Sequence, residues 1–124
     1  MKKCILIIDD ELIILDSLKI QLERMIGNSF DIEAASSGEE AIELLSEMYE
    51  NKVPLFMVIS DYNLDDMKGT QVLKYALEKF PAIKKVILSG QLDEDDIRNF
   101  DSTFGLDLRL GKPWNIYDFL EKIN

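Results

Sequence analysis

Short apolar runs alternate along the chain with segments in which apolar residues recur every three or four positions. Runs of strand length occupy residues 4–8, 30–34, 55–60, 85–88 and 106–111, and a segment of helical character follows each of them. This alternation is typical of βαβ units that wind around a parallel sheet. We therefore predict an α/β fold with five strands and five helices.

Local signals place the ends of several elements. Ser37, followed three residues later by Glu40, forms a capping box that predicts a helix start. Gly27 predicts the end of the preceding helix, and Pro81 the end of the third. The run at 30–34 alternates polar and apolar residues, which favours an edge position in the sheet. In the first helix the apolar residues at helical spacing are Leu12, Leu15, Leu18, Leu22 and Met25.

The last two helical segments differ in character. Residues 92–104 are polar and weakly periodic, with acidic residues where the first helical turn would lie, so we expect a marginal, mobile helix there. Residues 115–123 carry Ile116, Phe119 and Leu120 on one face and predict an amphipathic helix.

Composition limits the possible functions. A chain of 124 residues, 47% hydrophobic, suits a single domain over residues 1–124. The net charge of −10 repels nucleic-acid phosphates and anionic lipids, so we expect neither direct nucleic-acid binding nor membrane association. The apolar run before Asp9 is too short for a signal-peptide core or a membrane span, which predicts a cytoplasmic protein. The single Cys4 is expected to be a core residue, and the absence of His removes imidazole chemistry.

Charged side chains stand where three of the predicted strands end. Asp9 and Asp10 follow the first strand, Asp61 follows the third, and Lys112 follows the fifth. The carboxyl ends of parallel strands meet at one edge of the sheet, where α/β proteins place their sites. Two carboxylates about 4 Å apart repel by roughly 4 kcal/mol at an effective dielectric of about 20. A hard divalent cation relieves this repulsion, which points to Mg²⁺, with room left for phosphate oxygens.

Each of these residues also has an ordinary structural interpretation. Asp9 and Asp10 suit the cap of the first helix, and Asp61 suits an Asx turn. Ser89 suits the start of a loop, and Lys112 before Pro113 suits the end of a strand. The joint pattern on successive strands favours a shared site over four unrelated features.

The same combination resembles the receiver domain of two-component response regulators over essentially the whole chain. In that family an acidic pair ends the first strand, a phosphoacceptor Asp the third, a Thr or Ser the fourth, and a Lys before Pro the fifth. Asp9 with Asp10, Asp61, Ser89 and Lys112 occupy these places in order. The resemblance implies a flavodoxin-like, doubly wound sheet with strand order 2-1-3-4-5.

The resemblance also implies a mechanism. Asp61 would accept a phosphoryl group from a phosphohistidine of a sensor histidine kinase or a histidine phosphotransfer protein. Mg²⁺, or Mn²⁺ in its place, would be held by Asp9, Asp10, Asp61 and the backbone carbonyl of Asn63, and Lys112 would pair with the phosphoryl group. Such a domain signals and is not an enzyme, since it catalyses only its own phosphotransfer and self-dephosphorylation.

The implied output is a conformational switch. Ser89 would bind the phosphoryl group and draw in the loop before the fourth helix. Arg109 stands where the family commonly has the aromatic residue that completes this switch, which puts the usual coupling in doubt. The arginine is expected to be solvated, the alternative being a pair across a dimer with Asp95 or Asp96. A homodimer through the fourth-helix to fifth-helix face, a downstream effector and an attached output domain all remain open.

Several positions near Asp61 modify this expectation. Asn63 and Gln91 stand where the family tunes phosphoryl lifetime, and their neutral amides predict moderate self-dephosphorylation. Asp65 and Asp66 add negative charge that is expected to loosen the loop. Tyr62 is expected either to shield the phosphoryl group or contact a partner, or else simply to lie on the surface.

Two other functions compete with this one. A receiver-like module that needs no phosphate is disfavoured because it would have no reason to keep the repelling carboxylates. A Mg²⁺-dependent phosphatase of the haloacid-dehalogenase type is disfavoured because Glu11 stands where its second Asp is needed, and because the chain has no room for a substrate cap.

Overall fold

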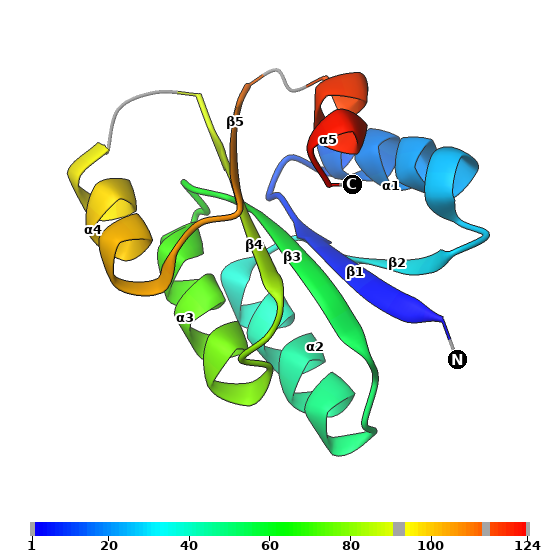
Figure 1. Cartoon of the computed structure of the whole chain (residues 1–124), viewed down its shortest axis with the longest axis horizontal. Helices are drawn as coiled ribbons and strands as arrows, with labels where there is room; N and C mark the ends of the chain where they lie inside the picture. The colour runs from blue at the N-terminus through cyan, green and yellow to red at the C-terminus, as the bar shows by residue number, and fades with distance from the viewer. Residues whose placement is uncertain (1, 91–93, 113–114, 124) are drawn as a thin grey trace.

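The computed structural model describes residues 2–90, 94–112 and 115–123 and contains five strands and five helices in strict alternation (Figure 1). The side chains of 94, 122 and 123 lie outside this description. In chain order the elements are β1 (Lys3–Ile8), α1 (Leu12–Ile26), β2 (Phe30–Ala35), α2 (Gly38–Glu50), β3 (Leu55–Asp61), α3 (Gly69–Lys79), β4 (Lys84–Ser89), α4 (Glu94–Phe104), β5 (Leu108–Gly111) and α5 (Ile116–Ile123).

The strands form one parallel sheet with the order β2-β1-β3-β4-β5, as the resemblance implied. The expected edge position of β2 is confirmed. The chain order reverses between β1 and β3, so the topological switch point lies between their carboxyl ends. This is the place where an open α/β sheet forms a crevice.

Helices cover both faces of the sheet, which explains why the strands read as nearly continuous apolar runs. Alternate residues of β1 enter different cores, with Leu6 and Ile8 facing one helical layer and Ile5 and Ile7 the other. The first layer consists of α2, α3 and α4, and the second of α1 and α5 (Figure 1). Cys4 is buried in the first core, as expected for a small hydrophobic residue.

Details of the helices depart from the sequence pattern. On α1 the expected apolar stripe is buried only at its centre: Leu15, Leu18 and Leu22 are buried, whereas Leu12 and Met25 are exposed. Both exposed residues lie at the ends of the helix, beyond the part that packs on the sheet. The capping box of α2 is altered as well. Ser37 Oγ accepts the Glu40 amide at 3.0 Å, but the Glu40 carboxylate accepts the amide of Ser36 rather than that of Ser37.

The predicted fourth helix is present, and β5 begins two residues later than the apolar run suggested. Residues 106–107 instead form the approach to β5, where Asp107 accepts the Lys85 amide at 2.7 Å. Within the part of the chain that the structure describes, no helix is long and apolar enough to cross a membrane.

Candidate functional site

The carboxyl ends of β1 and β3 bring three carboxylates together. Ile8 pairs with Ser60, so Asp9 and Asp61 leave their strands side by side. Asp9, Asp10 and Asp61 can each direct one oxygen into a group in which all three oxygens lie within 4.8 Å of one another. Asp9 and Asp61 are buried and Asp10 is half-buried. The juxtaposition expected from the strand ends is therefore present.

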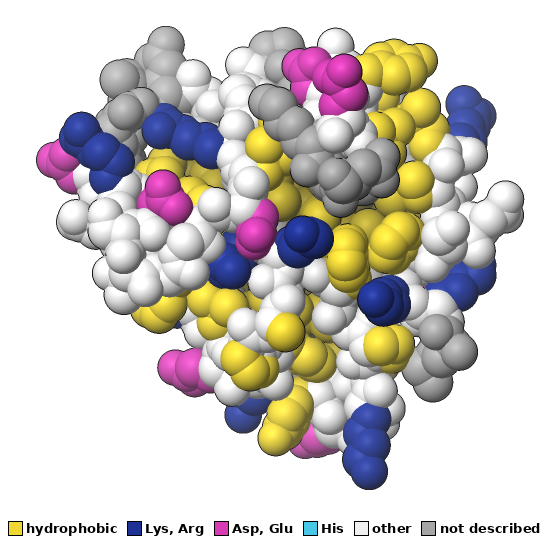
Figure 2. Space-filling view, in the orientation of Figure 1, with side chains coloured by type: hydrophobic (Ala, Val, Ile, Leu, Met, Phe, Trp, Pro, Cys, Tyr) yellow, Lys and Arg dark blue, Asp and Glu magenta, His cyan; other side chains and the backbone are white. Residues whose placement is uncertain are grey.

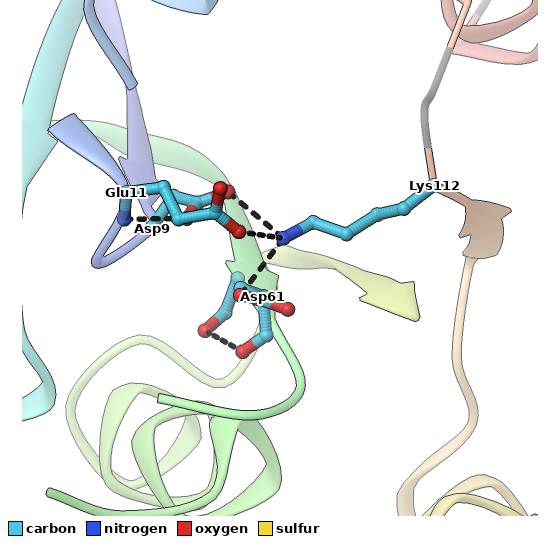
Figure 3. A network of polar contacts seen from close by, with 5 residues as sticks. Asp9, Glu11, Asp61 and Lys112 are labelled. Carbon is cyan, nitrogen blue, oxygen red and sulfur yellow. Dashed lines mark hydrogen bonds and ion pairs between the residues drawn. The ribbon is translucent and has the colours of Figure 1, made fainter. Parts of the chain in front are cut away.

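Lys112 extends from the end of β5 into this group (Figure 3). Its Nζ donates to Asp61 Oδ2 at 2.9 Å and lies 3.2 Å from Asp9 Oδ2 and 3.8 Å from Glu11 Oε1. One ammonium therefore faces several carboxylates and leaves the cluster with a net negative charge. Pro113 and Trp114, which follow it in the sequence, lie outside the described residues, as does the expected cis peptide between Lys112 and Pro113.

Asp9 carries the clearest sign of an incomplete set of contacts. Its Oδ1 accepts the Glu11 amide at 2.9 Å, whereas its Oδ2 is buried and accepts no hydrogen bond of ordinary geometry from the described residues. The 3.2 Å contact between this oxygen and Lys112 is an ion pair. A buried carboxylate oxygen without a hydrogen bond is costly. The oxygens of the cluster therefore fit a hard divalent cation, which would add a close contact to this oxygen.

Burial, together with neighbouring charged groups, shifts the pKa values within the cluster. Burial raises the pKa of the Asp61 carboxyl group, although the hydrogen bond and charge of Lys112 act in the opposite direction. Burial, followed by the neighbouring Asp65 carboxyl group, raises the pKa of Asp10. Burial lowers the pKa of Lys112, but the hydrogen bond and charge of Asp61 outweigh it, so the net pKa is raised and the ammonium keeps its proton.

A tight loop joins Asp61 to α3. The Gly69 amide donates to the Tyr62 carbonyl at 2.7 Å, and Asn63 and Lys68 form an isolated antiparallel bridge. A Cβ on Gly69 would lie 2.3 Å from the Asp61 carbonyl oxygen, so only glycine permits this approach. The Asn63 side-chain oxygen accepts Lys68 Nζ at 2.7 Å. The amide expected to act on a phosphoryl group is therefore held by a neighbouring lysine.

The expectation that Asp65 and Asp66 loosen this loop is wrong for Asp66. Its two carboxylate oxygens accept hydrogen bonds from the backbone amides of Gly38 and Glu39, at 3.0 and 2.9 Å. These amides lie in the first turn of α2, where a helix offers them no acceptor of its own. Helix N-termini favour an anion in this place. These bonds lower the pKa of Asp66, the Glu39 amide contributing most. Asp66 therefore anchors the loop to α2.

The remaining predicted residues lie around the same edge of the sheet. Ser89 ends β4, is buried, and pairs with Gly111, so it stands beside the strand end that carries Lys112. Arg109 lies on β5 and is exposed. Gln91 lies outside the described residues. Asp95, the alternative partner of Arg109 across a dimer, pairs within its own helix with Arg98.

Tyr62 is not a surface residue. It is 2% exposed, and its hydroxyl donates to Asp96 Oδ2 on α4 at 2.9 Å. Thr70, at the start of α3, donates to the same oxygen at 2.7 Å. Sequence reasoning missed this network because its members lie 26 and 34 positions apart, and no local pattern links them.

A comparison with protein-family profiles identifies the family of this chain. The profile described as the response regulator receiver domain matches residues 5–124. The chain belongs to this family. A receiver domain is a signalling domain of response regulators and not a conventional enzyme, which agrees with the resemblance drawn from the motifs.

Known proteins extend this assignment. The hydrogenase transcriptional regulatory protein HoxA of Cupriavidus necator is 28% identical over 110 residues, which are 89% of this receiver domain and 21% of HoxA. The chain spans between about a fifth and about half of the length of the curated relatives it matches.

Solved receiver structures share the fold. A CheY-like receiver domain protein from Methanospirillum hungatei JF-1 is 33% identical, with a TM-score of 0.80 and coverage of 99% of this chain and 91% of that one. A response regulator from Burkholderia pseudomallei, solved with a phosphorylated aspartic acid, a calcium ion and citrate, is 21% identical. Its TM-score is 0.80, and the match covers 99% of this chain and 67% of that one.

Proposed function

We propose that this receiver domain is a phosphorylation-operated switch in which Asp61 accepts a phosphoryl group from a phosphohistidine of a histidine kinase or phosphotransfer protein. The observation that carries the proposal is the contact of Lys112 Nζ with both Asp61 and Asp9 inside a group of three carboxylates. A purely structural ion pair would need one carboxylate and one ammonium. The extra carboxylates are a cost that a cation and a phosphoryl group explain.

Asp61 is the nucleophile. An oxygen of its carboxylate attacks phosphorus in line with the bond to the donor imidazole nitrogen. The new O–P bond forms as the P–N bond breaks, and the imidazole leaves with the bonding electron pair. Lys112 then shifts its hydrogen bond from Asp61 Oδ2 toward the phosphoryl oxygens, which carry more negative charge than the carboxylate did.

Asp9, Asp10, Asp61 and the backbone carbonyl of Asn63 would hold Mg²⁺, or Mn²⁺, in this domain. The buried Oδ2 of Asp9 supports this ligand set, because its contact with the described protein groups is the 3.2 Å ion pair with Lys112, whose ammonium hydrogen-bonds to Asp61 instead. When bound, the ion would neutralise charge on the phosphoryl oxygens. The Burkholderia response regulator was solved with both a phosphorylated aspartic acid and a calcium ion, which supports a divalent ion in such a domain.

Ser89 and Arg109 would carry the signal to the α4 and β5 face. Ser89 supports this role because it is buried at the end of β4, next to the strand end that bears Lys112. Arg109 offers an exposed cation on β5 that an effector, an output domain or a second copy of the chain would contact. Asn63 and Gln91 would tune phosphoryl lifetime, with Lys68 restraining the Asn63 amide.

The α1 face would receive the kinase or phosphotransfer protein. Ile13 is 87% exposed and lies with Ile14 and Ser17 in a groove that also includes Lys112. This groove opens directly beside the phosphoacceptor cluster. Helix α1 therefore offers an apolar contact surface at the point where a donor histidine must approach.

Intact mass spectrometry tests this function. The chain is incubated with acetyl phosphate in Mg²⁺ and, separately, in EDTA, together with the Asp61→Asn variant. We expect one phosphoryl adduct on the wild-type chain in Mg²⁺, and none in EDTA or on the variant. Absence of the adduct, accompanied by absence of Mg²⁺ binding in calorimetry, would instead support a module that needs no phosphate.

A further inference from the structure

One carboxylate oxygen joins three elements of the domain. Asp96 Oδ2, on the first turn of α4, accepts the hydroxyl of Tyr62 at 2.9 Å and the hydroxyl of Thr70 at 2.7 Å. Tyr62 follows Asp61 directly, and Thr70 belongs to the first turn of α3. The bonds therefore tie α4 to the loop that carries the phosphoacceptor. Hydrogen bonds to an ionised acceptor are stronger than neutral ones.

The donor side chains of Tyr62 and Thr70 are fixed by packing and would not move with α4 if that helix shifted. Tyr62 is 2% exposed and Thr70 is 1% exposed, so both side chains are fixed by packing, whereas Asp96 is half-buried at the edge of α4. The bonds from Thr70 and then Tyr62, with the charges of Lys74 and Lys68, lower the pKa of Asp96 despite its partial burial. The acceptor is therefore ionised at neutral pH. A shift of α4 away from α3 would break both bonds.

Tyr62 also connects this tie to the end of β4. Its backbone amide donates to the Leu88 carbonyl at 2.8 Å, and its carbonyl accepts the Gly69 amide at 2.7 Å. Leu88 precedes Ser89, and α4 begins five positions after Ser89. One residue therefore contacts the phosphoacceptor strand, the end of β4 and α4 at the same time.

We propose that Asp96 is a latch that holds α4 against the phosphoacceptor loop through Tyr62 and Thr70, and that phosphorylation of Asp61 is coupled to release of this latch. The inference rests on the proposed function, since it assumes that Asp61 accepts a phosphoryl group. Hydrogen bonds that exist in the unphosphorylated state stabilise that state relative to any state that lacks them. Because coupling is reciprocal, removing the latch shifts the equilibrium toward the phosphorylated state.

Four variants distinguish the loss of the Asp96 hydrogen bonds from a general change in the charge of α4. Asp96→Ala removes the acceptor, Tyr62→Phe removes one donor and keeps the ring, and Asp96→Asn keeps an acceptor oxygen without the charge. Asp95→Ala is the matched control, because it removes the same charge from the same turn of α4 at an exposed position. Two readouts are used: hydrogen exchange of α4 without any phosphodonor, and the steady-state ratio of phosphorylated to free chain in Mg²⁺ and acetyl phosphate.

We expect Asp96→Ala to raise the exchange rate of the α4 amides by tenfold or more, because it removes two bonds and the loss of one such bond corresponds to about tenfold, and to raise the phosphorylated-to-free ratio as well. Tyr62→Phe should give a smaller increase, and no further increase when it is combined with Asp96→Ala. Asp96→Asn should lie between Asp96→Ala and the wild type, and Asp95→Ala should match the wild type.

Contrary results separate the two proposals. If the wild-type chain is phosphorylated and Asp96→Ala changes neither readout, or if Tyr62→Phe and Asp96→Ala act additively, the latch is overturned while the proposed function stands. A wild-type chain that takes up no phosphoryl group overturns the proposed function, and the coupling with it.

Discussion

Lys112 balances part of the negative charge of the site. Its ammonium lies within 4 Å of oxygens of Asp61, Asp9 and Glu11, so one positive charge faces three negative ones. Burial makes this imbalance costly because the interior screens charge less than water does. Burial is the largest cause of the raised pKa values of Asp61 and Asp10, and a neighbouring carboxylate adds to each: Asp9 for Asp61 and Asp65 for Asp10.

The raised pKa of Asp61 predicts a pH dependence of stability. Its folded pKa lies above the unfolded value of 3.8, so the ionised group lowers stability above the folded pKa. Stability therefore rises as the pH falls through the folded pKa toward 3.8. In EDTA at constant ionic strength, urea unfolding should show a free energy of unfolding that is larger near pH 5 than near pH 7.5.

The Asp61→Asn variant supplies the control for this dependence. It lacks the titrating group, so its free energy of unfolding should rise less over the same pH range. The carboxyl groups with lowered pKa, Asp66 and Asp96, lose their stabilising effect only below 3.8 and do not disturb the measurement. An equal rise in both proteins would show that the titration of Asp61 is not responsible.

At the residue scale, the sequence predicts those site residues that are charged and directly follow a predicted strand. Asp9, Asp61 and Lys112 were each identifiable because a charged residue closes an apolar run. Tyr62 and Asp96 were not, because a tyrosine beside a strand end and an aspartate on a polar helix have no meaning until α4 packs beside α3. Their bond depends on tertiary structure alone.

Helix α2 and the loop after β3 form a unit at the scale of elements. The Asp66 carboxylate caps the first amides of α2 from a loop 27 and 28 positions away, next to the local cap from Ser37. A Cβ on Gly38 would meet Met67 Cγ at 2.4 Å, so the loop also packs closely on the start of the helix. The local cap is predictable from Ser37 and Glu40, whereas the distant one has no signature in the sequence.

The Asp66→Ala variant tests this anchor. Loss of the cap should lower the free energy of unfolding by about 1 kcal/mol, the usual cost of removing a helix N-cap. Chemical denaturation at neutral pH measures it. Asp65→Ala is the matched control from the same loop, and it should not destabilise, because the Asp65 carboxyl group raises the pKa of Asp10. Equal destabilisation by both variants would contradict the anchor.

The whole molecule carries a net charge of −10, and its Lys and Arg side chains are interspersed with acidic and apolar groups on the face drawn in Figure 2. At this net charge, a simple salt such as NaCl weakens the self-repulsion of the folded chain by screening. The strand alternation was predictable from the apolar pattern at this scale. The strand order came only from the resemblance, because periodicity does not specify which parallel strands are neighbours.

Bound Mg²⁺ should stabilise the molecule beyond this screening. At a concentration of about 100 times the dissociation constant, binding adds roughly 2.7 kcal/mol to the free energy of unfolding. The melting temperature in MgCl₂ should therefore be higher than that in NaCl of equal ionic strength. The Asp9→Asn variant should lose most of this difference and should be more stable than the wild type in EDTA, because it removes a buried charge. Equal melting temperatures in the two salts would contradict a metal site.

The central claim is that Asp61, among three adjacent carboxylates, receives the phosphoryl group. Borohydride reduces an acyl phosphate to an alcohol and so converts a phosphorylated aspartate into homoserine, which peptide mass spectrometry locates. After incubation with acetyl phosphate and Mg²⁺, we predict homoserine at position 61 and unchanged residues at positions 9 and 10. Reduction at Asp9 or Asp10, or no reduced residue in a chain that binds Mg²⁺, would contradict the account.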